Sequence, residues 1–257
     1  MRLVFLGTGT STGVPQLRCR CATCSSADPR DKRLRASALI ECDNGVNLLI
    51  DCGPDFRSQM LRTHGDPDIE ALLITHQHYD HVGGIDDLRP YCSRDSDFNI
   101  FCQADVERDL RQRIPYAFAE NRYPGVPHFE FHQISPGCSF CIGGIDIMPL
   151  QVNHYRLEIV GFRIGRLVYI TDAKHISPET MAMIKGCDTL VINALRPATH
   201  ISHLSLAEAL AIIEETGPRV AYLTHISHDM PPQAETEKLL PPNVHMAFDG
   251  LEIEIPA

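Results

Sequence analysis

The chain has 257 residues, of which 44% are hydrophobic and 22% charged, and its formal net charge is −10. This composition is typical of a globular protein with a sizeable core and excludes a low-complexity chain. The acidic balance argues against binding of long nucleic acids, and no apolar run reaches the roughly 20 residues that cross a bilayer. The first apolar run stops at Gly7, which indicates a strand rather than a signal peptide, so we expect a cytoplasmic protein.

Short runs rich in Val, Ile and Leu predict strands along the whole chain. They cover residues 2–7, 37–43, 47–53, 71–76, 98–102, 145–154, 161–172, 189–194, 219–225 and 251–255. Apolar spacing near 3.6 residues predicts helices over 55–63, 104–117, 177–185 and 205–216. Ser177 before Pro178 and the capping-box pair Ser205 and Glu208 mark two helix starts. This mixture predicts an α/β (α+β) sandwich with more than one layer, in a single domain over residues 1–257.

Several of these runs end in a polar residue that can bind a metal. The residues are Asp51, His76, His154, Asp172 and His225. In layered folds, functional sites collect at strand ends and in the loops beyond them. We therefore expect these five side chains to converge on one cleft.

The strongest signal is the run His76-Gln77-His78-Tyr79-Asp80-His81. Two positions separate His76 from His78, so both side chains point to the same side of an extended backbone. Asp80 and His81 follow where the chain can turn, so the run can serve two adjacent metal ions. The alternative is a set of solvated loop histidines, which four metal-binding residues in this order disfavour.

This run resembles the metal-binding motif of the metallo-β-lactamase superfamily, whose later elements also appear in order along nearly the whole chain. The resemblance implies a four-layer αββα sandwich, with two mixed sheets packed face to face and helices outside. It assigns one metal to His76, His78 and His154. It assigns the other metal to Asp80, His81 and His225, and it makes Asp172 a ligand of both metals. Asp51 matches an aspartate that supports the metal-binding histidines without touching the metal.

The resemblance also implies two divalent ions that hold a bridging hydroxide as the attacking nucleophile. Ligation by His and Asp suits zinc or manganese, with iron as a third candidate. Two divalent ions, two aspartates and a hydroxide leave a site charge of about +1, which favours an anionic substrate. Lactone and thioester hydrolases use the same kind of cluster, so they remain alternatives.

His203 opens a helix between Asp172 and His225. It resembles the loop histidine of the phosphodiesterase branch, which contacts the phosphate and assists the leaving oxygen. A histidine at a helix start also lies beside N–H groups that favour an anion. The resemblance thus gives catalytic parts to His203 and Asp80. The alternatives are a surface histidine, or a role for His200 in its place.

Cys19, Cys21 and Cys24 form a CxCxxC run after the first strand. The run resembles that of PhnP-type cyclic phosphodiesterases, in which it binds a structural zinc with a histidine that matches His228. A Cys₃His site is ordinary zinc chemistry. A redox-active pair or free thiols are the alternatives.

Two further features stay open at this stage. Cys138 and Cys141 have the spacing of a metal-binding pair but no evident partners. Residues 105–131 combine arginines with aromatic side chains, which fits either a solvated helix and loop or a segment that covers the substrate.

These observations favour a hydrolase for a small phosphodiester, such as a cyclic nucleotide or sugar diester. The alternatives are a lactone or thioester hydrolase, a tRNA 3′-processing endonuclease and a non-catalytic metal-binding scaffold. We expect no membrane partner and no nucleic-acid partner, and a homodimer is compatible with the sequence.

Overall fold

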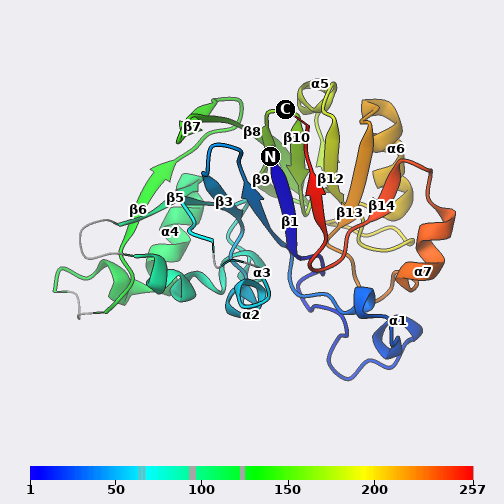
Figure 1. The fold of residues 1–257 in the computed structure, drawn as a ribbon, viewed down its shortest axis with the longest axis horizontal. Helices are drawn as coiled ribbons and strands as arrows, with labels where there is room; N and C mark the ends of the chain where they lie inside the picture. Colours follow the sequence, from blue (N-terminus) through cyan, green and yellow to red (C-terminus); the bar gives the residue numbers. More distant parts are fainter. Residues whose placement is uncertain (64, 66, 93–96, 122–124, 257) are drawn as a thin grey trace.

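Two β-sheets pack face to face in the computed structural model, and helices cover the outer surface of each sheet (Figure 1). The structure describes residues 1–63, 65, 67–92, 97–121 and 125–256. Both sheets contain parallel and antiparallel pairs. The four-layer αββα sandwich expected from the sequence is therefore confirmed.

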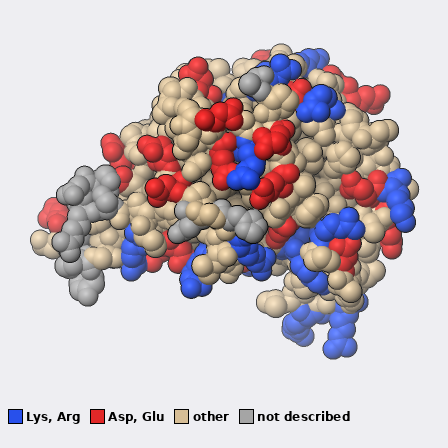
Figure 2. Space-filling model, viewed as in Figure 1, with Lys and Arg blue, Asp and Glu red and all other residues tan. Residues whose placement is uncertain are grey.

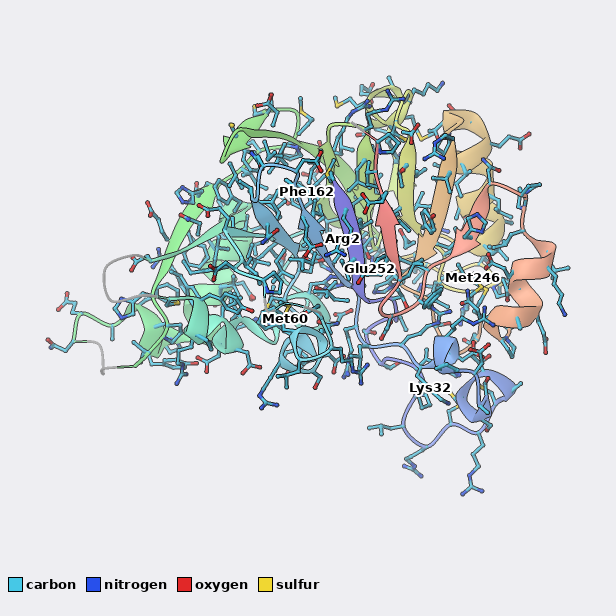
Figure 3. All side chains as sticks on the ribbon, viewed as in Figure 1. Arg2, Lys32, Met60, Phe162, Met246 and Glu252 are labelled. Atoms are coloured by element: carbon cyan, nitrogen blue, oxygen red, sulfur yellow. The ribbon has the colours of Figure 1, made fainter. Side chains whose placement is uncertain are left out.

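The first sheet has seven strands in the order β15-β1-β2-β3-β4-β5-β6. Their bounds are β1 (Arg2–Gly7), β2 (Ser37–Glu41), β3 (Asn47–Ile50), β4 (Ala71–Leu73), β5 (Phe98–Cys102), β6 (Phe129–Gln133) and β15 (Glu252–Glu254). Strands β3 to β6 pair in parallel, so their carboxyl ends meet at one edge. Strands β1 and β15 pair antiparallel, and Arg2 Nη1 donates to Glu252 Oε2 at 2.9 Å (Figure 3). The two ends of the described chain thus lie side by side.

The second sheet has eight strands, in the order β11-β8-β9-β10-β12-β13-β14 with β7 paired to β8. Their bounds are β7 (Phe140–Ile142), β8 (Ile145–His154), β9 (Leu157–Ile164), β10 (Leu167–Ile170), β11 (His175–Ile176), β12 (Thr189–Asn193), β13 (Val220–Thr224) and β14 (Val244–Met246). Strands β10, β12, β13 and β14 pair in parallel and share one carboxyl edge. Strands β9 and β10 divide the predicted run 161–172 into an antiparallel hairpin, with Gly165 at φ 56° in its turn.

The helices follow the apolar spacing seen in the sequence. Their bounds are α1 (Ala22–Ser25), α2 (Phe56–Met60), α3 (Tyr79–Val82), α4 (Ala104–Arg113), α5 (Pro178–Ile184), α6 (Leu206–Thr216) and α7 (Gln233–Thr236). Helices α2, α3 and α4 pack on the first sheet, and α5 and α6 on the second. The capping box of Ser205 and Glu208 is present, and Gly217 ends α6 in the left-handed conformation at φ 61°.

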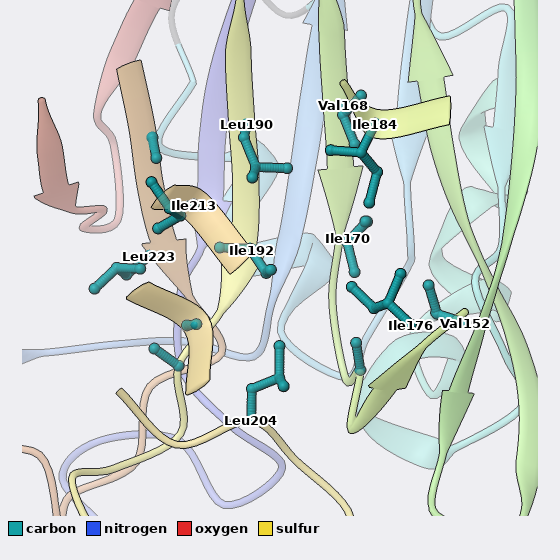
Figure 4. Packing of buried hydrophobic residues seen from close by; sticks show 14 of the residues in the cluster. Val152, Val168, Ile170, Ile176, Ile184, Leu190, Ile192, Leu204, Ile213 and Leu223 are labelled. Carbon is teal, nitrogen blue, oxygen red and sulfur yellow. The ribbon is translucent and has the colours of Figure 1, made fainter. Parts of the chain in front are cut away.

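Alternation along the strands places the core in three layers. Leu3 and Phe5 of β1 face the space between the sheets, whereas Val4 and Leu6 face the helices. In the second sheet, Leu190 and Ile192 point toward the helical layer, where Ile184 of α5 and Ile213 of α6 meet them (Figure 4). Burial on both faces explains why these strands read as continuous apolar runs.

The helix expected over 104–117 ends at Arg113, because Pro115 cannot continue the hydrogen-bond ladder and starts a 3₁₀ turn. Within α4, Arg111 pairs with Glu107 at 2.8 Å, which is the behaviour of a solvated helix face. Residues 122–124 of the arginine-rich and aromatic segment lie outside the described residues. A role of that segment in covering the substrate stays a prediction.

The visible surface carries acidic side chains over the two sheets, and basic side chains gather around the N-terminal loop near α1 (Figure 2). Lys32 lies in that loop, as Figure 3 shows. Within the described part of the chain, no helix is both long and apolar enough to cross a membrane.

Candidate metal centre

Five strand ends of the two sheets meet at one edge of the sandwich, as the sequence predicted. Asp51 follows β3, His76 follows β4, His154 ends β8, Asp172 follows β10 and His225 follows β13. Asp51, Asp172 and His225 adopt left-handed backbone conformations, with φ of 59°, 56° and 53°. A non-glycine residue in this region costs of order 1–3 kcal/mol and is concentrated at functional sites.

The first ligand group contains His76, His78 and His154, whose ligand atoms lie within 4.8 Å of one another. His76 Nε2 and His78 Nδ1 are 2.9 Å apart. His154 Nδ1 donates to the backbone oxygen of Ser202 at 2.8 Å, which leaves its Nε2 as the free lone pair. The predicted three-histidine set is therefore assembled.

The second ligand group contains Asp80, His81, Asp172 and His225, with the same 4.8 Å limit, and all four are buried. Asp80 and His81 lie in α3, whose N-cap position is His78. Asp172 Oδ2 is 3.2 Å from His81 Nε2, and its Oδ1 is 3.2 Å from His225 Nε2. Asp172 also groups with His154, so its position matches the shared role expected of it.

Unsatisfied buried nitrogen atoms show that these groups suit cations. His81 Nε2 and His225 Nε2 are buried and have no hydrogen-bond partner among the described residues. Buried polar atoms are ordinarily paired, and an unpaired imidazole nitrogen beside two carboxylates is the donor set of a divalent metal. The residues at this edge therefore fit metal ions.

The electrostatics of the second group also favour positive charge. Burial alone would raise the pKa of Asp172, but the rings of His225 and His81 hold it well below its ordinary value. For His81, burial works to lower the pKa, yet Asp172, Asp80 and Asp51 raise it well above its ordinary value. Carboxylates that attract a proton this strongly attract a metal cation by the same field.

Asp51 lies behind the ligands and is fully buried. Its Oδ2 accepts from His81 Nδ1 at 2.7 Å, and its Oδ1 accepts from the backbone N–H of Thr75 at 2.8 Å. Burial raises the pKa of Asp51. The contact directs the Nε2 lone pair of His81 into the cleft, as expected for a carboxylate that orients a metal-binding histidine.

His203 reaches the same cleft. Its Nδ1 lies 3.5 Å from Asp172 Oδ1, and its ring centroid lies 4.6 Å from that of His154. Burial and the neighbouring ring of His225 lower the pKa of His203 to about 3. His200 lies farther out, with its ring centroid 5.2 Å from that of His203.

The cysteine run forms a separate group together with the predicted histidine. The ligand atoms of Cys19, Cys21, Cys24 and His228 lie within 4.8 Å of one another. His228 Nδ1 is 3.4 Å from Cys19 Sγ and 3.6 Å from Cys21 Sγ. The backbone N–H of Cys24 lowers the pKa of Cys21 to about 6, and His228 acts in the same direction. Three sulfurs and one imidazole fit a tetrahedral zinc site.

Cys138 and Cys141 are exposed, and neither belongs to a potential ligand group among the described residues.

The sequence analysis missed two contacts at the site. Thr75 donates hydrogen bonds to Asp51 from its backbone N–H and its hydroxyl. It directly precedes His76, and that position was the signal by which the sequence could have indicated it. The backbone oxygen of Ser202 leaves no signal in a sequence.

Comparison with known proteins agrees with this geometry. Residues 46–226 match the family model described as the β-lactamase superfamily domain. The chain belongs to the β-lactamase superfamily. A crystal structure described as a new diphosphatase from the PhnP family is 37% identical, with a TM-score of 0.91 over 99% of this chain and 98% of that one. The PhnP-like assignment is thereby confirmed.

Two other relatives extend the comparison. An octanoyltransferase of Porphyromonas gingivalis is 41% identical over 253 residues, which are 98% of this chain and 51% of that protein, so the chain spans about half of its length. Zinc-bound PqqB from Methylobacterium extorquens has a TM-score of 0.81 at 21% identity over 99% of this chain and all of that one, which shows the shared fold. The chain therefore has the metallo-β-lactamase fold, and the PqqB of Methylobacterium extorquens is a protein of this fold with zinc bound.

Proposed function

We propose that this protein is a hydrolase, a dinuclear metal-dependent phosphodiesterase for a small anionic phosphodiester. One observation carries the proposal: His203 lies at the boundary of the two ligand groups. Its Nδ1 is 3.5 Å from Asp172 Oδ1, and its ring stacks on that of His225 at 4.9 Å between centroids. The ligand atom of His203 also lies within 4.8 Å of those of His154 and Asp172. Because the two larger groups have three or more ligands without it, we assign this imidazole to contact with a substrate oxygen.

Two divalent ions, of zinc or manganese with iron as a third candidate, fit the two groups. His76, His78 and His154 would hold one, Asp80, His81 and His225 the other, with Asp172 between them. When bound, such ions supply a water of lowered pKa and neutralise the charge that develops on the phosphoryl oxygens. We also assign a structural zinc to Cys19, Cys21, Cys24 and His228.

The chain's own residues orient the site. Asp51 holds the tautomer of His81, and the backbone oxygen of Ser202 holds that of His154. His203 donates a hydrogen bond to the phosphate and assists the leaving oxygen. Asp80 and Asp172 contribute two negative charges against four positive charges of the ions, so the loaded site favours an anion.

Hydrolysis of a lactone or thioester is the second candidate, because the relative from Porphyromonas gingivalis is named for acyl transfer. Only half of that protein is matched. Human tRNase Z, short form, shares the fold at 19% identity and a TM-score of 0.73. The net charge of −10 supports a small substrate rather than tRNA.

The deciding experiment compares bis(p-nitrophenyl) phosphate with homoserine lactone and thioester substrates on the metal-loaded protein. We expect diester turnover, and we expect His203→Ala to lower kcat by about 10²–10⁴-fold while the bound metal is retained. His132→Ala is the matched control, since His132 pairs with Asn99 on the first sheet. Turnover of a lactone or thioester without turnover of the diester would overturn the proposal.

A further inference from the structure

The backbone at His225, in the second ligand group, is held by a segment that follows the first sheet. His225 has a left-handed backbone at φ 53°, and such a conformation persists only where the surrounding structure fixes it. The next residue, Ile226, donates its N–H to the backbone oxygen of Thr8 at 2.9 Å and accepts from the N–H of Thr10 at 3.0 Å. The segment after β1 therefore fixes the turn that presents His225.

The buried side chain of Thr8 fixes this segment in turn. Its hydroxyl donates to Asp249 Oδ1 at 2.8 Å, and its backbone N–H donates to the same oxygen at 2.9 Å. Arg33 Nη1 donates to the hydroxyl oxygen at 2.8 Å. One hydroxyl thus gives its proton to a carboxylate and its lone pair to a guanidinium, so both of its roles are defined and charge-assisted.

Asp249 and Arg33 anchor the hydroxyl to the rest of the chain. Asp249 Oδ2 accepts from the backbone N–H of Leu34 at 2.7 Å, and Arg33 Nη1 also donates to the backbone oxygen of Ala247 at 2.6 Å. Burial lowers the pKa of Arg33 to about 10, so its guanidinium is still charged at neutral pH. Removal of the group that bridges two buried charges leaves each of them short of a partner, which costs free energy.

The first ligand group is held by other contacts. His76 Nδ1 lies 3.0 Å from the hydroxyl of Thr75, and His154 Nδ1 donates to the backbone oxygen of Ser202 at 2.8 Å. The contacts of Thr8 lead instead to the second group, and the function proposed above gives them no role. A change at Thr8 is therefore expected to act on the second group and to spare the first.

We propose that Thr8 is a positioning residue of the metal centre. Its hydroxyl, held between Asp249 and Arg33, fixes the turn at Ile226 and through it the direction of the His225 ring. This inference rests on the metal-dependent function proposed above and adds to it a residue that touches neither metal nor substrate. Thr8 acts through the backbone, whereas Asp51 acts on a ligand ring directly.

Two variants separate the hydroxyl from the shape of the side chain. Thr8→Val removes the hydroxyl at nearly constant volume, and Thr8→Ser keeps it. Zinc affinities are measured by titration with competing chelators that resolve the metal sites. We expect Thr8→Val to weaken the metal of the second group by about fivefold or more, with the other sites unchanged, and Thr8→Ser to keep wild-type affinity. Thr180→Val is the matched control, since Thr180 is also buried and its hydroxyl donates to the backbone oxygen of Gln151 at 2.7 Å.

Hydrogen exchange of the Ile226 amide in the metal-loaded protein is a second readout, because this N–H bonds to the backbone oxygen of Thr8. We expect exchange about tenfold faster in Thr8→Val, and wild-type exchange in Thr8→Ser and Thr180→Val. A thermal melt shows whether Thr8→Val is folded. If it is not, Asp249→Asn takes its place, since the single oxygen of Asn cannot serve both Thr8 and Leu34, and the same two effects are expected.

Wild-type metal affinity and wild-type Ile226 exchange in the folded variant would overturn the role of Thr8. Equal weakening of all metal sites would also overturn it, because a general loss of stability has that effect, and so would a Thr8→Ser variant as weak as Thr8→Val. A wild type that binds its metals but hydrolyses no diester would overturn the phosphodiesterase function instead. Metal affinity and hydrogen exchange are measured without substrate, so the two failures are distinguishable.

Discussion

Replacement of Asp51 by Asn is the sharpest test of how the second ligand group is held. Asp51 Oδ2 accepts from His81 Nδ1 at 2.7 Å, while Oδ1 accepts from the backbone N–H of Thr75 at 2.8 Å. The single oxygen of Asn can serve Thr75, but its amino group then faces the N–H of His81. The ring is driven to the other tautomer, in which Nε2 carries the proton that must be absent from a metal ligand.

Loss of such a supporting carboxylate lowers metal affinity by about 10–100-fold, which corresponds to about 1.4–2.8 kcal/mol. The assay is a titration with competing chelators that resolves the metal sites, together with diester turnover and a thermal melt. Asp188→Asn is the control, since Asp188 is also buried but pairs with arginines far from the site. We expect one weakened site in Asp51→Asn, with the cysteine-bound metal unchanged. Wild-type affinity at every site would refute the proposed role of Asp51.

Three further outcomes are expected. We expect Cys21→Ser to remove one zinc per chain in metal analysis and to leave the other two ions bound. The control Cys138→Ser, at an exposed cysteine, removes none. Equal metal contents in the two variants would contradict the structural zinc. Gly53→Ala lowers the unfolding free energy by about 1–3 kcal/mol in urea titrations, because an added Cβ would lie 2.1 Å from the backbone oxygen of Asp80. An unchanged urea midpoint would contradict this close approach of Gly53 to Asp80. Burial raises the pKa of Asp249 to about 6, above the unfolded value of about 3.9, so the folded state binds the extra proton and stability falls as pH rises through this range. The loss from pH 5 to pH 7 is about 1 kcal/mol, measured as the difference between wild type and Asp249→Asn, and a pH-independent difference would contradict it.

The sequence predicted the strand ends well because the strands of this fold are buried on both faces. Leu48–Ile50 of β3 and Leu167–Ile170 of β10 are buried, so Asp51 and Asp172 just beyond these strands stand out. The run from His76 to His81 also predicted both ligand groups, because it supplies His76 and His78 to the first and Asp80 and His81 to the second. The left-handed backbone at Asp172 and His225 could not be foreseen, because side-chain type does not demand it there.

Other elements were missed for physical reasons. Strand β6 lies at the edge of the first sheet with only Phe129 buried, and it begins within the segment 105–131, which fitted a helix and loop. Strands β7 and β14 have only three residues each, and β11 has two, so none has enough length for a periodic pattern. The position of the backbone oxygen of Ser202 depends on a loop, whose course the sequence does not determine.

The four-membered cysteine and histidine group joins distant parts of the chain. Cys19 and His228 are 209 positions apart, yet their ligand atoms lie 3.4 Å from each other. A zinc ion bound there closes a loop of most of the chain's length. In the chain-entropy treatment used for disulfides, a closure of this length removes about 5 kcal/mol of freedom from the unfolded ensemble. Since His228 follows His225 by three residues, a zinc ion held by this group would also restrain the loop that carries His225 of the second ligand group.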